Sequence, residues 1–259
     1  MSQLEPLTLE FRARYHEIDP MGATRLPVIL SWLQDAGGTH AKQLGVSLKE
    51  LHKIGLTWVL SRLNLQMIRY PGYNEPIAVQ TWPATREGLF SIRDYRLYDR
   101  NSQIIAMASS SWAALDLKTR RPVKLNDHLP DYPLRQERAI EDRFDTLPLL
   151  DGCHTSLQLP VLRSDLDQNQ HVNNTVYAAW AMEAVPSSIA DHYRPSSIEI
   201  GFRAEALYGD KINSCCAPTE DDPHTLIHRI EKADDARELA RLKTFWRPSA
   251  ELIRPGRQQ

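Results

Sequence analysis

The chain has 259 residues, of which 42% are hydrophobic and 25% charged, and its formal net charge is −2. These values are typical of a soluble globular protein with enough apolar material for one large core or two medium ones. The near balance of acidic and basic residues excludes a strongly basic nucleic-acid-binding protein, and no apolar run approaches the roughly 18 residues that a membrane-spanning helix needs.

The first half of the chain is predicted to contain one strand, one long helix and four further strands. Apolar and polar residues alternate from Leu7 to Tyr15, which is typical of a strand with one buried face. Thr24 is placed to cap a helix that runs on toward Leu44. Four apolar runs bounded by turn-forming residues are then predicted as strands: Trp58–Arg69, Ile77–Trp82, Ser91–Tyr98 and Ile104–Leu115.

The second half is predicted to repeat this order. A short strand near Leu157–Arg163 precedes a helix at Thr175–Val185, which Pro186 ends. Four strands follow: Ser197–Ala206, Lys211–Cys216, Thr225–Glu231 and Glu238–Arg247. A sheet that long, with one helix in each half, buries its apolar face by curling around that helix. We therefore expect an α+β fold of two tandem units, 1–125 and 151–259, joined by a surface linker at 126–150 that is rich in proline and charge.

Matching residues support a duplicated unit. When Asp167 is placed over Asp19, an offset of 148 residues, Trp180 falls on Trp32 and an acidic residue followed by alanine matches in both helices. The offset falls to 135 and then 134 in the later strands, which one insertion near Leu44–Leu56 explains. The alternative is a chance alignment with freely chosen offsets. The common order of predicted elements favours the repeat.

The two copies differ just before their helices. These segments read Asp19-Pro-Met21-Gly-Ala23 in the first copy and Asp167-Gln-Asn169-Gln-His171 in the second. A helix N-terminus offers free N–H groups and a positive dipole end that can stabilise an oxyanion, and histidine can transfer protons near neutral pH. Asp167 is close enough in sequence to orient either Asn169 or His171. Spacing alone leaves two interpretations open: an active site for acyl chemistry, or a polar turn and helix cap that Asn173 or Asn174 completes.

Several familiar signatures are missing from the sequence. It has no G-x-G-x-x-G, P-loop, G-x-S-x-G, H-E-x-x-H or C-x-x-C motif. An enzyme with this sequence is expected to work with side chains and water, without a cofactor or metal. The three cysteines, an odd number of which two are adjacent, predict no disulfide framework and a reducing, cytoplasmic location. The first six residues resemble neither a secretory signal nor a transit peptide.

The stretch Ser164–Asn174 resembles the most specific segment of the acyl-acyl-carrier-protein thioesterases, a family of double-hotdog enzymes in plants and bacteria. Four segments of the first half also resemble this family: Thr57–Arg62, Arg69–Pro71, Ser110–Trp112 and Leu117–Pro122. The resemblance covers residues 8–247. It implies two hotdog units in one chain, each a long helix wrapped by a curved antiparallel sheet. It also implies hydrolysis of fatty acyl-carrier-protein thioesters to free fatty acid.

The resemblance implies a catalytic set as well. The family's Asp, Asn and His correspond to Asp167, Asn169 and His171, and its downstream glutamate corresponds to Glu205. The cysteine that follows this glutamate in the family is Ala206 here, so no thiol is available at that position. We expect Glu205 to act as general base on a water, or less readily as a direct nucleophile. Asn169 and His171 would position the water and polarise the carbonyl, and Asp167 would orient them, with Asp167 as the rival base.

Strand parity gives a competing interpretation of Glu205. If the strand continued to Ala206, Glu205 would share a face with Glu199 and Arg203, opposite the apolar residues, and would simply face solvent. A bulge near Gly201 or after Phe202 would re-aim it. The resemblance favours a catalytic role.

The resemblance implies that the first unit shapes a pocket for the acyl tail. Trp32, Trp58 and Trp82 are candidates to line it, although a large aromatic residue is more often part of a core. The implied partner is acyl carrier protein, an acidic protein, and the chain itself would be a monomer or a homodimer. Because the net charge is near zero, any docking patch must be local. Two basic clusters are candidates, although such clusters are more often solvated strand edges: Arg93, Arg96 and Arg100, and Lys118, Arg120, Arg121 and Lys124.

Two other functions compete with this one. An acyl-CoA thioesterase would use the same scaffold, and a non-catalytic acyl-thioester sensor would bind without hydrolysis. Retention of Asn169, His171 and Glu205 argues against the sensor. Hotdog dehydratases use a more widely spaced Asp and His than Asp167 and His171.

Overall fold

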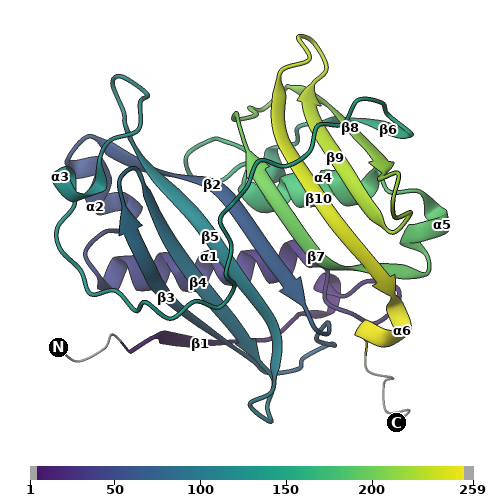
Figure 1. Cartoon of the computed structure of the whole chain (residues 1–259), viewed down its shortest axis with the longest axis horizontal. Coiled ribbons are helices and arrows are strands. Elements are labelled where there is room, and N and C mark those ends of the chain that lie inside the picture. Colours follow the sequence, from purple (N-terminus) through teal and green to yellow (C-terminus); the bar gives the residue numbers. More distant parts are fainter. Residues whose placement is uncertain (1–4, 254–259) are drawn as a thin grey trace.

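The computed structural model describes residues 5–253. They form one extended α+β molecule (Figure 1). The strands are β1 (Leu7–Phe11), β2 (Leu56–Met67), β3 (Ile77–Glu87), β4 (Phe90–Tyr98), β5 (Ile104–Asp116), β6 (Thr155–Pro160), β7 (Tyr193–Phe202), β8 (Lys211–Pro218), β9 (Thr225–Lys232) and β10 (Glu238–Pro248). The helices are α1 (Leu26–Gln43), α2 (Leu48–Lys53), α3 (Leu125–His128), α4 (Asn174–Glu183), α5 (Ser187–Ala190) and α6 (Ser249–Leu252).

The strands form one antiparallel sheet of ten strands in the order β1-β3-β4-β5-β2-β7-β10-β9-β8-β6. Read outward from the central β2–β7 pair, the two halves have the same order of corresponding strands. At that joint Leu63 pairs with Ile200 and Leu65 with Ile198, so the halves are related by an approximate twofold axis. The predicted fold of two units, each a helix held against an antiparallel sheet, is confirmed.

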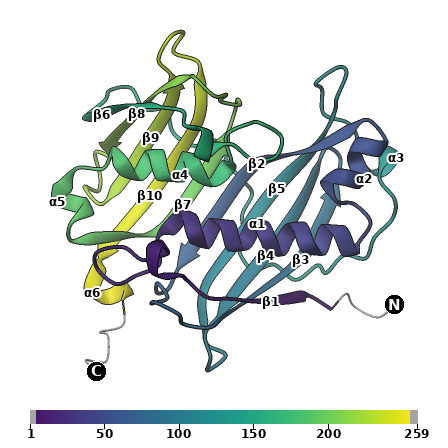
Figure 2. The same cartoon turned by 180° about the vertical axis from the view of Figure 1, so that it is seen from behind.

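The core lies between the sheet and its two long helices. Figure 2 shows α1 and α4 on the same face of the sheet, where their neighbouring ends pack against each other. Along α1, Ile29, Leu33 and Ala36 are buried, a spacing that places them on one face of the helix. They join a single apolar cluster that also includes Trp180 of α4 and continues through both units. Burial of these side chains in one shared cluster holds the two halves together.

The duplication extends to individual hydrogen bonds in the loops before the helices. Asp19 accepts the backbone N–H groups of Met21 and Ala23, and Asp167 accepts those of Asn169 and His171. Gly22 and Gln170, which match in the repeat, both have left-handed φ angles, of 83° and 63°. The same turn is therefore built twice, which confirms the predicted repeat.

The boundaries of several elements differ from those predicted. Thr24 does not cap α1, because its hydroxyl donates to the carbonyl of Pro71 on the neighbouring loop. The first strand ends at Phe11, since the chain turns through a short 3-10 helix at Tyr15–Glu17. Strand β3 runs past Trp82 to Glu87, with a register shift after Pro83 that accommodates the missing N–H group. The other helix, α4, ends at Glu183, ahead of Pro186.

The inserted segment of the first half forms α2, and α1 is also longer than its counterpart. α1 has 18 residues and α4 has 10, so the last two turns of α1 have no equivalent in the second half. These extra turns and the insertion lie together at the N-terminal unit's end of the sheet (Figure 2).

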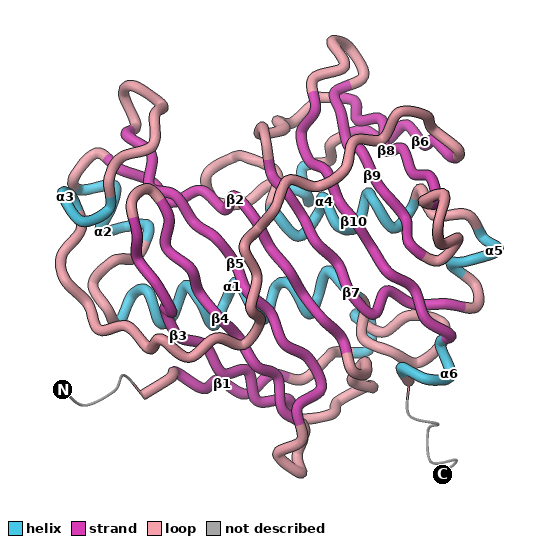
Figure 3. Tube along the Cα trace, viewed as in Figure 1, coloured by secondary structure: helices cyan, strands magenta, loops and turns pink. Residues whose placement is uncertain are grey.

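Residues 129–154 contain no helix or strand and cross the outer face of the sheet, opposite the long helices (Figure 3). Polar groups of the sheet are paired by this segment: Arg138 forms an ion pair with Asp94, and Asn64 donates to Asp142. The indole N–H of Trp82 donates to the carbonyl of Glu137. The segment therefore satisfies buried polar groups that the sheet alone would leave without partners.

The three cysteines, from which no disulfide framework was predicted, do form one disulfide. Cys153, just before β6, is bonded to Cys215 on the adjacent strand β8, with a Cα–Cα separation of 5.5 Å. An odd number of cysteines requires only that one stays free, and this one is the buried Cys216. Cys215 and Cys216 are both buried on β8. Over the described residues, no helix has the length and apolarity needed to cross a membrane.

Candidate active site

The loop from Asp167 to His171 is fixed by backbone hydrogen bonds at both ends. The N–H of Asp167 donates to the carbonyl of His171 over 2.8 Å, and His171 forms a β-bridge with Leu207. The next residues begin α4, where the side chain of Asn173 accepts the N–H of Thr175 over 3.0 Å. Asn173 is thus the N-cap of α4, and neither Asn169 nor His171 caps the helix.

Glu205 lies in a loop and not on a strand. β7 ends at Phe202, and the N–H groups of Arg203 and Ala204 both donate to the carbonyl of Leu239. This irregularity ends the alternation of faces, so the parity argument for a solvent-facing Glu205 does not apply. A bulge-like break after Phe202, one of the two expected positions, is what re-aims the side chain.

Tyr177 of α4 holds the loop that carries Glu205. Its hydroxyl accepts the N–H of Ala206 over 3.0 Å and donates to the carbonyl of Ala204 over 3.4 Å. Burial raises the pKa of Tyr177 to about 12, so the hydroxyl keeps its proton and can both donate and accept near neutral pH. One side chain therefore brackets Glu205 through the two adjacent peptide groups.

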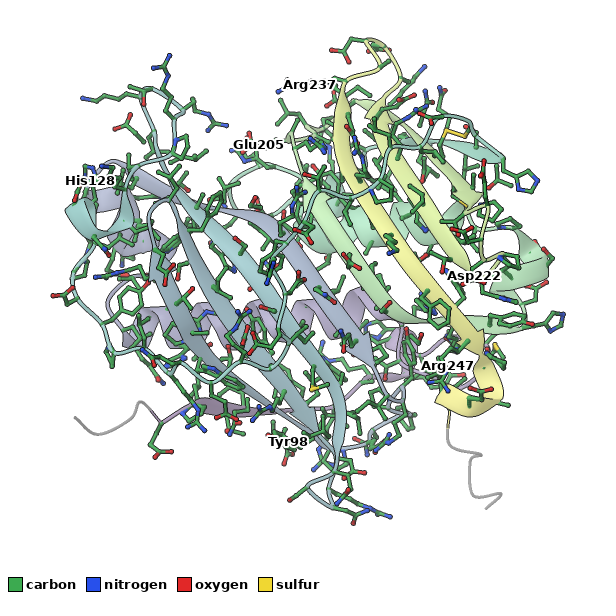
Figure 4. All side chains as sticks on the ribbon, in the orientation of Figure 1. Tyr98, His128, Glu205, Asp222, Arg237 and Arg247 are labelled. Atoms are coloured by element: carbon green, nitrogen blue, oxygen red, sulfur yellow. A yellow bond between two sulfur atoms is a disulfide. The ribbon has the colours of Figure 1, made fainter. Side chains whose placement is uncertain are left out.

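Two cationic or potentially cationic groups face the carboxylate of Glu205. Nε2 of His171 lies 3.7 Å from Oε2 of Glu205, and Nη2 of Arg120 lies 2.8 Å from the same oxygen. Arg120 belongs to the turn between β5 and α3 in the other unit and has a left-handed φ of 58°. In Figure 4, Glu205 is labelled in the space between that turn and the β9–β10 connection. The structure thus brings His171 and Glu205 together at the junction of the two units.

Asp167 and Asn169 form a second pair. Oδ1 of Asp167 accepts the N–H of Asn169 over 2.8 Å, and Oδ2 accepts the side-chain amide of Asn169 over 3.3 Å. Asp167 reaches His171 only through its backbone N–H, over 3.4 Å. Asp167 therefore orients the Asn169 amide but does not contact the imidazole ring.

A cavity of about 640 Å³ begins at this loop and extends into the N-terminal unit. Asp167, Asn169 and Asn174 line it on one side, whereas His171 and Glu205 do not line it. The rest of the wall comes from α1, the inserted segment and strands β2, β4 and β5. A smaller apolar pocket of about 30 Å³ adjoins it and shares Asn174. The loop thus stands between an open cavity on one side and an exposed carboxylate–histidine pair on the other.

Of the three tryptophans considered for the pocket, only Trp58 lines the cavity. Trp32 is buried in the core, and Trp82 is buried on the outer face of the sheet beneath residues 129–154. Trp112 of β5, which was not among the candidates, lines both the cavity and the smaller pocket.

The first of the two basic clusters does not exist as a surface patch. Arg93 and Arg96 are three residues apart on β4 and therefore point to opposite faces of the sheet. Arg93 is buried beside α1 and lines the cavity, whereas Arg96 forms an ion pair with Glu137 over 2.7 Å on the outer face. Only Arg100 of this group is exposed.

The first copy lacks each reactive group of the second except the aspartate. In each copy, the backbone N–H groups of two successive residues donate to one carbonyl oxygen, and the residue that follows them is Tyr70 in the first copy and Glu205 in the second. Tyr70 is buried, and its hydroxyl donates to the carbonyl of Pro195 over 2.7 Å. Asp19, by contrast, accepts the same backbone groups as Asp167. The shared aspartate builds the turn, and the second copy adds the groups that can do chemistry.

A thiol mechanism has no suitable cysteine. Cys216 is fully buried, and burial raises the pKa of its thiol. It packs against Ala184 and Val185 just beyond the C-terminal end of α4, while the candidate site lies at the N-terminal end, about 15 Å away along a helix of this length. Among residues 5–253, no group of three or more potential ligands is placed to hold a metal ion.

Sequence reasoning missed the parts played by Arg120, Tyr177 and Asn174. Arg120 stood in a basic cluster, but nothing in the sequence shows that its turn reaches Glu205. Tyr177 could have been noticed because the repeat places Ile29 at the same position of α1, so the hydroxyl is an addition of the second copy. Asn174 was considered only as a cap.

Both halves of the chain match models of a known protein family. The model "Acyl-ACP thioesterase N-terminal domain" matches residues 7–132, and "Acyl-ACP thioesterase C-terminal domain" matches residues 151–248. The oleoyl-acyl carrier protein thioesterase of Coriandrum sativum is 24% identical over 93% of this chain and 77% of that protein. The palmitoyl-acyl carrier protein thioesterase of Cuphea hookeriana is 28% identical over 94% of this chain and 62% of that protein.

Solved structures give the same result. An acyl-ACP thioesterase from Bacteroides thetaiotaomicron superposes with a TM-score of 0.80 at 26% identity, over 93% of this chain and 98% of that one. The 12:0-ACP thioesterase from Umbellularia californica has the same fold, with a TM-score of 0.80 at 24% identity, over 94% of this chain and 97% of that one. With two consecutive family models matching most of its length, this chain belongs to the acyl-ACP thioesterase family.

Proposed function

We propose that the protein hydrolyses fatty acyl thioesters of acyl carrier protein, with residues 151–259 supplying the catalytic groups and residues 1–125 the acyl pocket. The observation that carries this proposal is the position of one loop. Its Asn169 lines the cavity, and its His171 lies 3.7 Å from the carboxylate of Glu205 on the other side of the loop. A thioester at this loop would have its acyl chain in the cavity and its thiol side toward the surface, where a carrier protein has access.

The roles follow from the chemistry of each group. Glu205 is the general base that takes a proton from the attacking water, and His171 is placed beside it to hold that water or to protonate the leaving thiolate. Asn169 supplies a donor for the carbonyl oxygen as it becomes negative, and the N-terminus of α4 adds the positive end of its dipole. Asp167 positions Asn169 through the hydrogen bond between their side chains. No cofactor takes part in these steps.

Removal of one donor or proton-transfer group tests the assignment. His171→Ala and Asn169→Ala should each lower the kcat for a fatty acyl-carrier-protein substrate by at least about 100-fold, the scale of losing a positioned acid–base or oxyanion group. Both side chains are partly or largely exposed, so the fold should be retained. The measurement is steady-state hydrolysis together with circular dichroism of each variant. His154→Ala, which changes an exposed histidine of the same unit, is the matched control and should retain full activity.

Near-normal turnover by either variant would show that the site is misassigned. The carrier is tested separately, by comparing kcat/KM for acyl-carrier-protein and acyl-CoA substrates with the same acyl chain. A strong preference for CoA would replace the carrier-protein assignment with an acyl-CoA thioesterase on the same scaffold.

A further inference from the structure

The cavity contains a buried guanidinium that no acidic residue neutralises. Arg93 is 9% exposed and lines the cavity, and no carboxylate of the described residues lies within ion-pair distance of it. The neighbouring Asp94 cannot serve, because it points to the opposite face of the sheet and pairs with Arg138. Asp35 of α1 also lines the cavity, but it is exposed and forms no ion pair with Arg93. A buried charge without a partner is costly, so its retention calls for an explanation.

Among residues 5–253, only one nitrogen of this guanidinium has protein partners. Nη1 of Arg93 lies 3.2 Å from Nδ1 of His40 and 3.2 Å from Oγ1 of Thr81. Because arginine can only donate, Nδ1 of His40 accepts, and His40 is therefore neutral. Burial, with a further contribution from Arg93, lowers the pKa of His40 to about 4, which agrees with that state. Within the described part of the chain, Nε and Nη2 of Arg93 have no protein hydrogen-bond partner, and neither is sealed from the cavity.

The fold itself does not need an arginine at this position. Arg93 is opposite Ser110 in the β4–β5 pair. Ser110 matches Thr244 of the second copy, and Thr244 is opposite Leu226 in the β9–β10 pair. Leu226 is therefore the counterpart of Arg93. Leu226 is fully buried in an apolar cluster. The second copy also has no counterpart of the last turns of α1, which carry His40. Arg93 and the cavity beside it are therefore features of the first copy alone.

The local packing keeps the guanidinium in place. A Cβ atom on Gly37 of α1 would lie 2.7 Å from the hydroxyl of Tyr95 and 3.2 Å from Cδ of Arg93, so only glycine leaves room for both side chains against the helix. The indole rings of Trp58 and Trp112 supply apolar wall in the same cavity. The cavity thus combines surface for methylene groups with one edge of a guanidinium, where the N–H of Nε and one N–H of Nη2 form a fixed fork.

We propose that the cavity accepts an acyl chain that ends in a carboxylate, with Arg93 binding that distal carboxylate. Such a ligand supplies the missing negative charge, and its two oxygens can accept the N–H of Nε and one N–H of Nη2 at once. This inference rests on the proposed function, since it places the thioester at Asn169 and the far end of the chain in the N-terminal unit. It deepens that function by naming the substrate class as half-thioesters of dicarboxylic acids.

Matched substrates test the inference directly. Octanoyl-carrier protein and its octanedioyl analogue, which differ only in the distal carboxylate, are compared by kcat/KM. The wild-type protein should prefer the octanedioyl substrate by at least tenfold. Arg93→Leu, which installs the residue of the second copy, should reverse this preference, and Arg93→Lys should give an intermediate ratio. Arg96→Leu, which removes a guanidinium from the outer face of the same strand, is the control and should leave the ratio unchanged.

A binding measurement separates this inference from the proposed function. An octanedioyl chain joined to pantetheine by an amide cannot be hydrolysed, and its affinity is measured by calorimetry against that of the octanoyl amide. Tighter binding of the octanedioyl amide that is lost in Arg93→Leu supports the inference even if acyl-carrier-protein thioesters are not hydrolysed. Equal or weaker binding to the wild-type protein overturns it, whether or not Arg93→Leu folds. A wild-type preference for the octanoyl substrate, or for an ω-hydroxylated chain over the carboxylated one, overturns it as well.

Discussion

Asp167 and Glu205 are the two carboxylates from which the general base must be chosen, and their surroundings differ. Oδ1 of Asp167 accepts two backbone N–H groups, and Asp19 does the same in the copy without Asn169 and His171. A group that is needed to form the turn in both copies has a structural reason to be present. Glu205 has no such reason, because Tyr70 takes its place in the first copy.

Substitution of Asp167 by asparagine separates the two roles. Asparagine keeps an oxygen for the backbone N–H groups but loses the charge, so Asp167→Asn should fold normally and lose no more than about tenfold in kcat. Asp167→Ala removes the acceptor and should lower both stability, by about 1 kcal/mol or more, and activity. Glu205→Gln should lower kcat by at least about 100-fold. The measurements are steady-state kinetics and urea unfolding; a 100-fold loss in Asp167→Asn with full activity in Glu205→Gln would make Asp167 the base.

The limits of sequence reasoning are clearest at single residues. The pairing of Asn169 with Asp167 needed only their spacing, because a local turn brings them together. The contact between Arg120 and Glu205 joins two units across 85 residues and leaves no local pattern. Arg93 was grouped with Arg96 and Arg100 by position along the chain alone, although the odd spacing of Arg93 and Arg96 on the predicted strand already places them on opposite faces.

At the level of elements, α4 joins the two parts of the site. Its N-terminus follows the Asp167–His171 loop, and Tyr177 in its second turn holds the loop of Glu205. All ten strands and the two long helices, α1 and α4, were predicted from periodicity and turn residues, whereas the short helices α2, α3, α5 and α6 were not. The errors concern element boundaries that tertiary contacts determine. Thr24 does not cap α1 because it bonds to another loop, and β7 ends where two N–H groups share the carbonyl of Leu239.

Tyr177→Phe should impair catalysis through the position of Glu205. Loss of the hydroxyl leaves the buried N–H of Ala206 without its partner, at a cost of about 1–3 kcal/mol in the free energy of unfolding. We expect kcat to fall by at least about tenfold while KM changes little, because the acyl cavity is untouched.

Ser214→Ala is the matched control for this variant. Its hydroxyl donates to the carbonyl of Trp180 near the other end of α4, over 2.8 Å. It should cost similar stability and leave kcat unchanged. If both variants lose activity in proportion to stability, Tyr177 has only a structural role.

For the whole molecule, two buried histidines make stability depend on pH. Burial lowers the pKa of His228 to about 3, and burial together with Arg93 lowers that of His40 to about 4. Both are neutral in the folded state at pH 6, whereas in the unfolded chain they take up protons below about pH 6.5. Stability is therefore fully present above that pH and falls as the pH drops toward the folded pKa values, by about 1.4 kcal/mol per pH unit for each histidine.

His228→Gln isolates one of these contributions. The amide can keep a hydrogen bond to Thr244, which Nε2 of His228 makes over 2.8 Å, but it does not titrate. Free energies of unfolding are measured by urea titration at pH 7, 6 and 5. With falling pH they should decrease less steeply for the variant, because one fewer proton is taken up on unfolding. Identical pH dependence of the variant and the wild-type protein would show that His228 is not protonated selectively in the unfolded chain.

The symmetric order of strands around the β2–β7 joint has a consequence for how such a protein can change. In a homodimer of identical halves, every substitution occurs twice, so a group that helps in one half must be tolerated in the other. Fusion into one chain removes this constraint. The first half can then do without counterparts of Glu205 and His171 and place Arg93 in its interior. The second half keeps Glu205 and His171 and has the aliphatic Leu226 at the position of Arg93. Specificity and reactivity can thus evolve separately, each in its own half of a shared sheet.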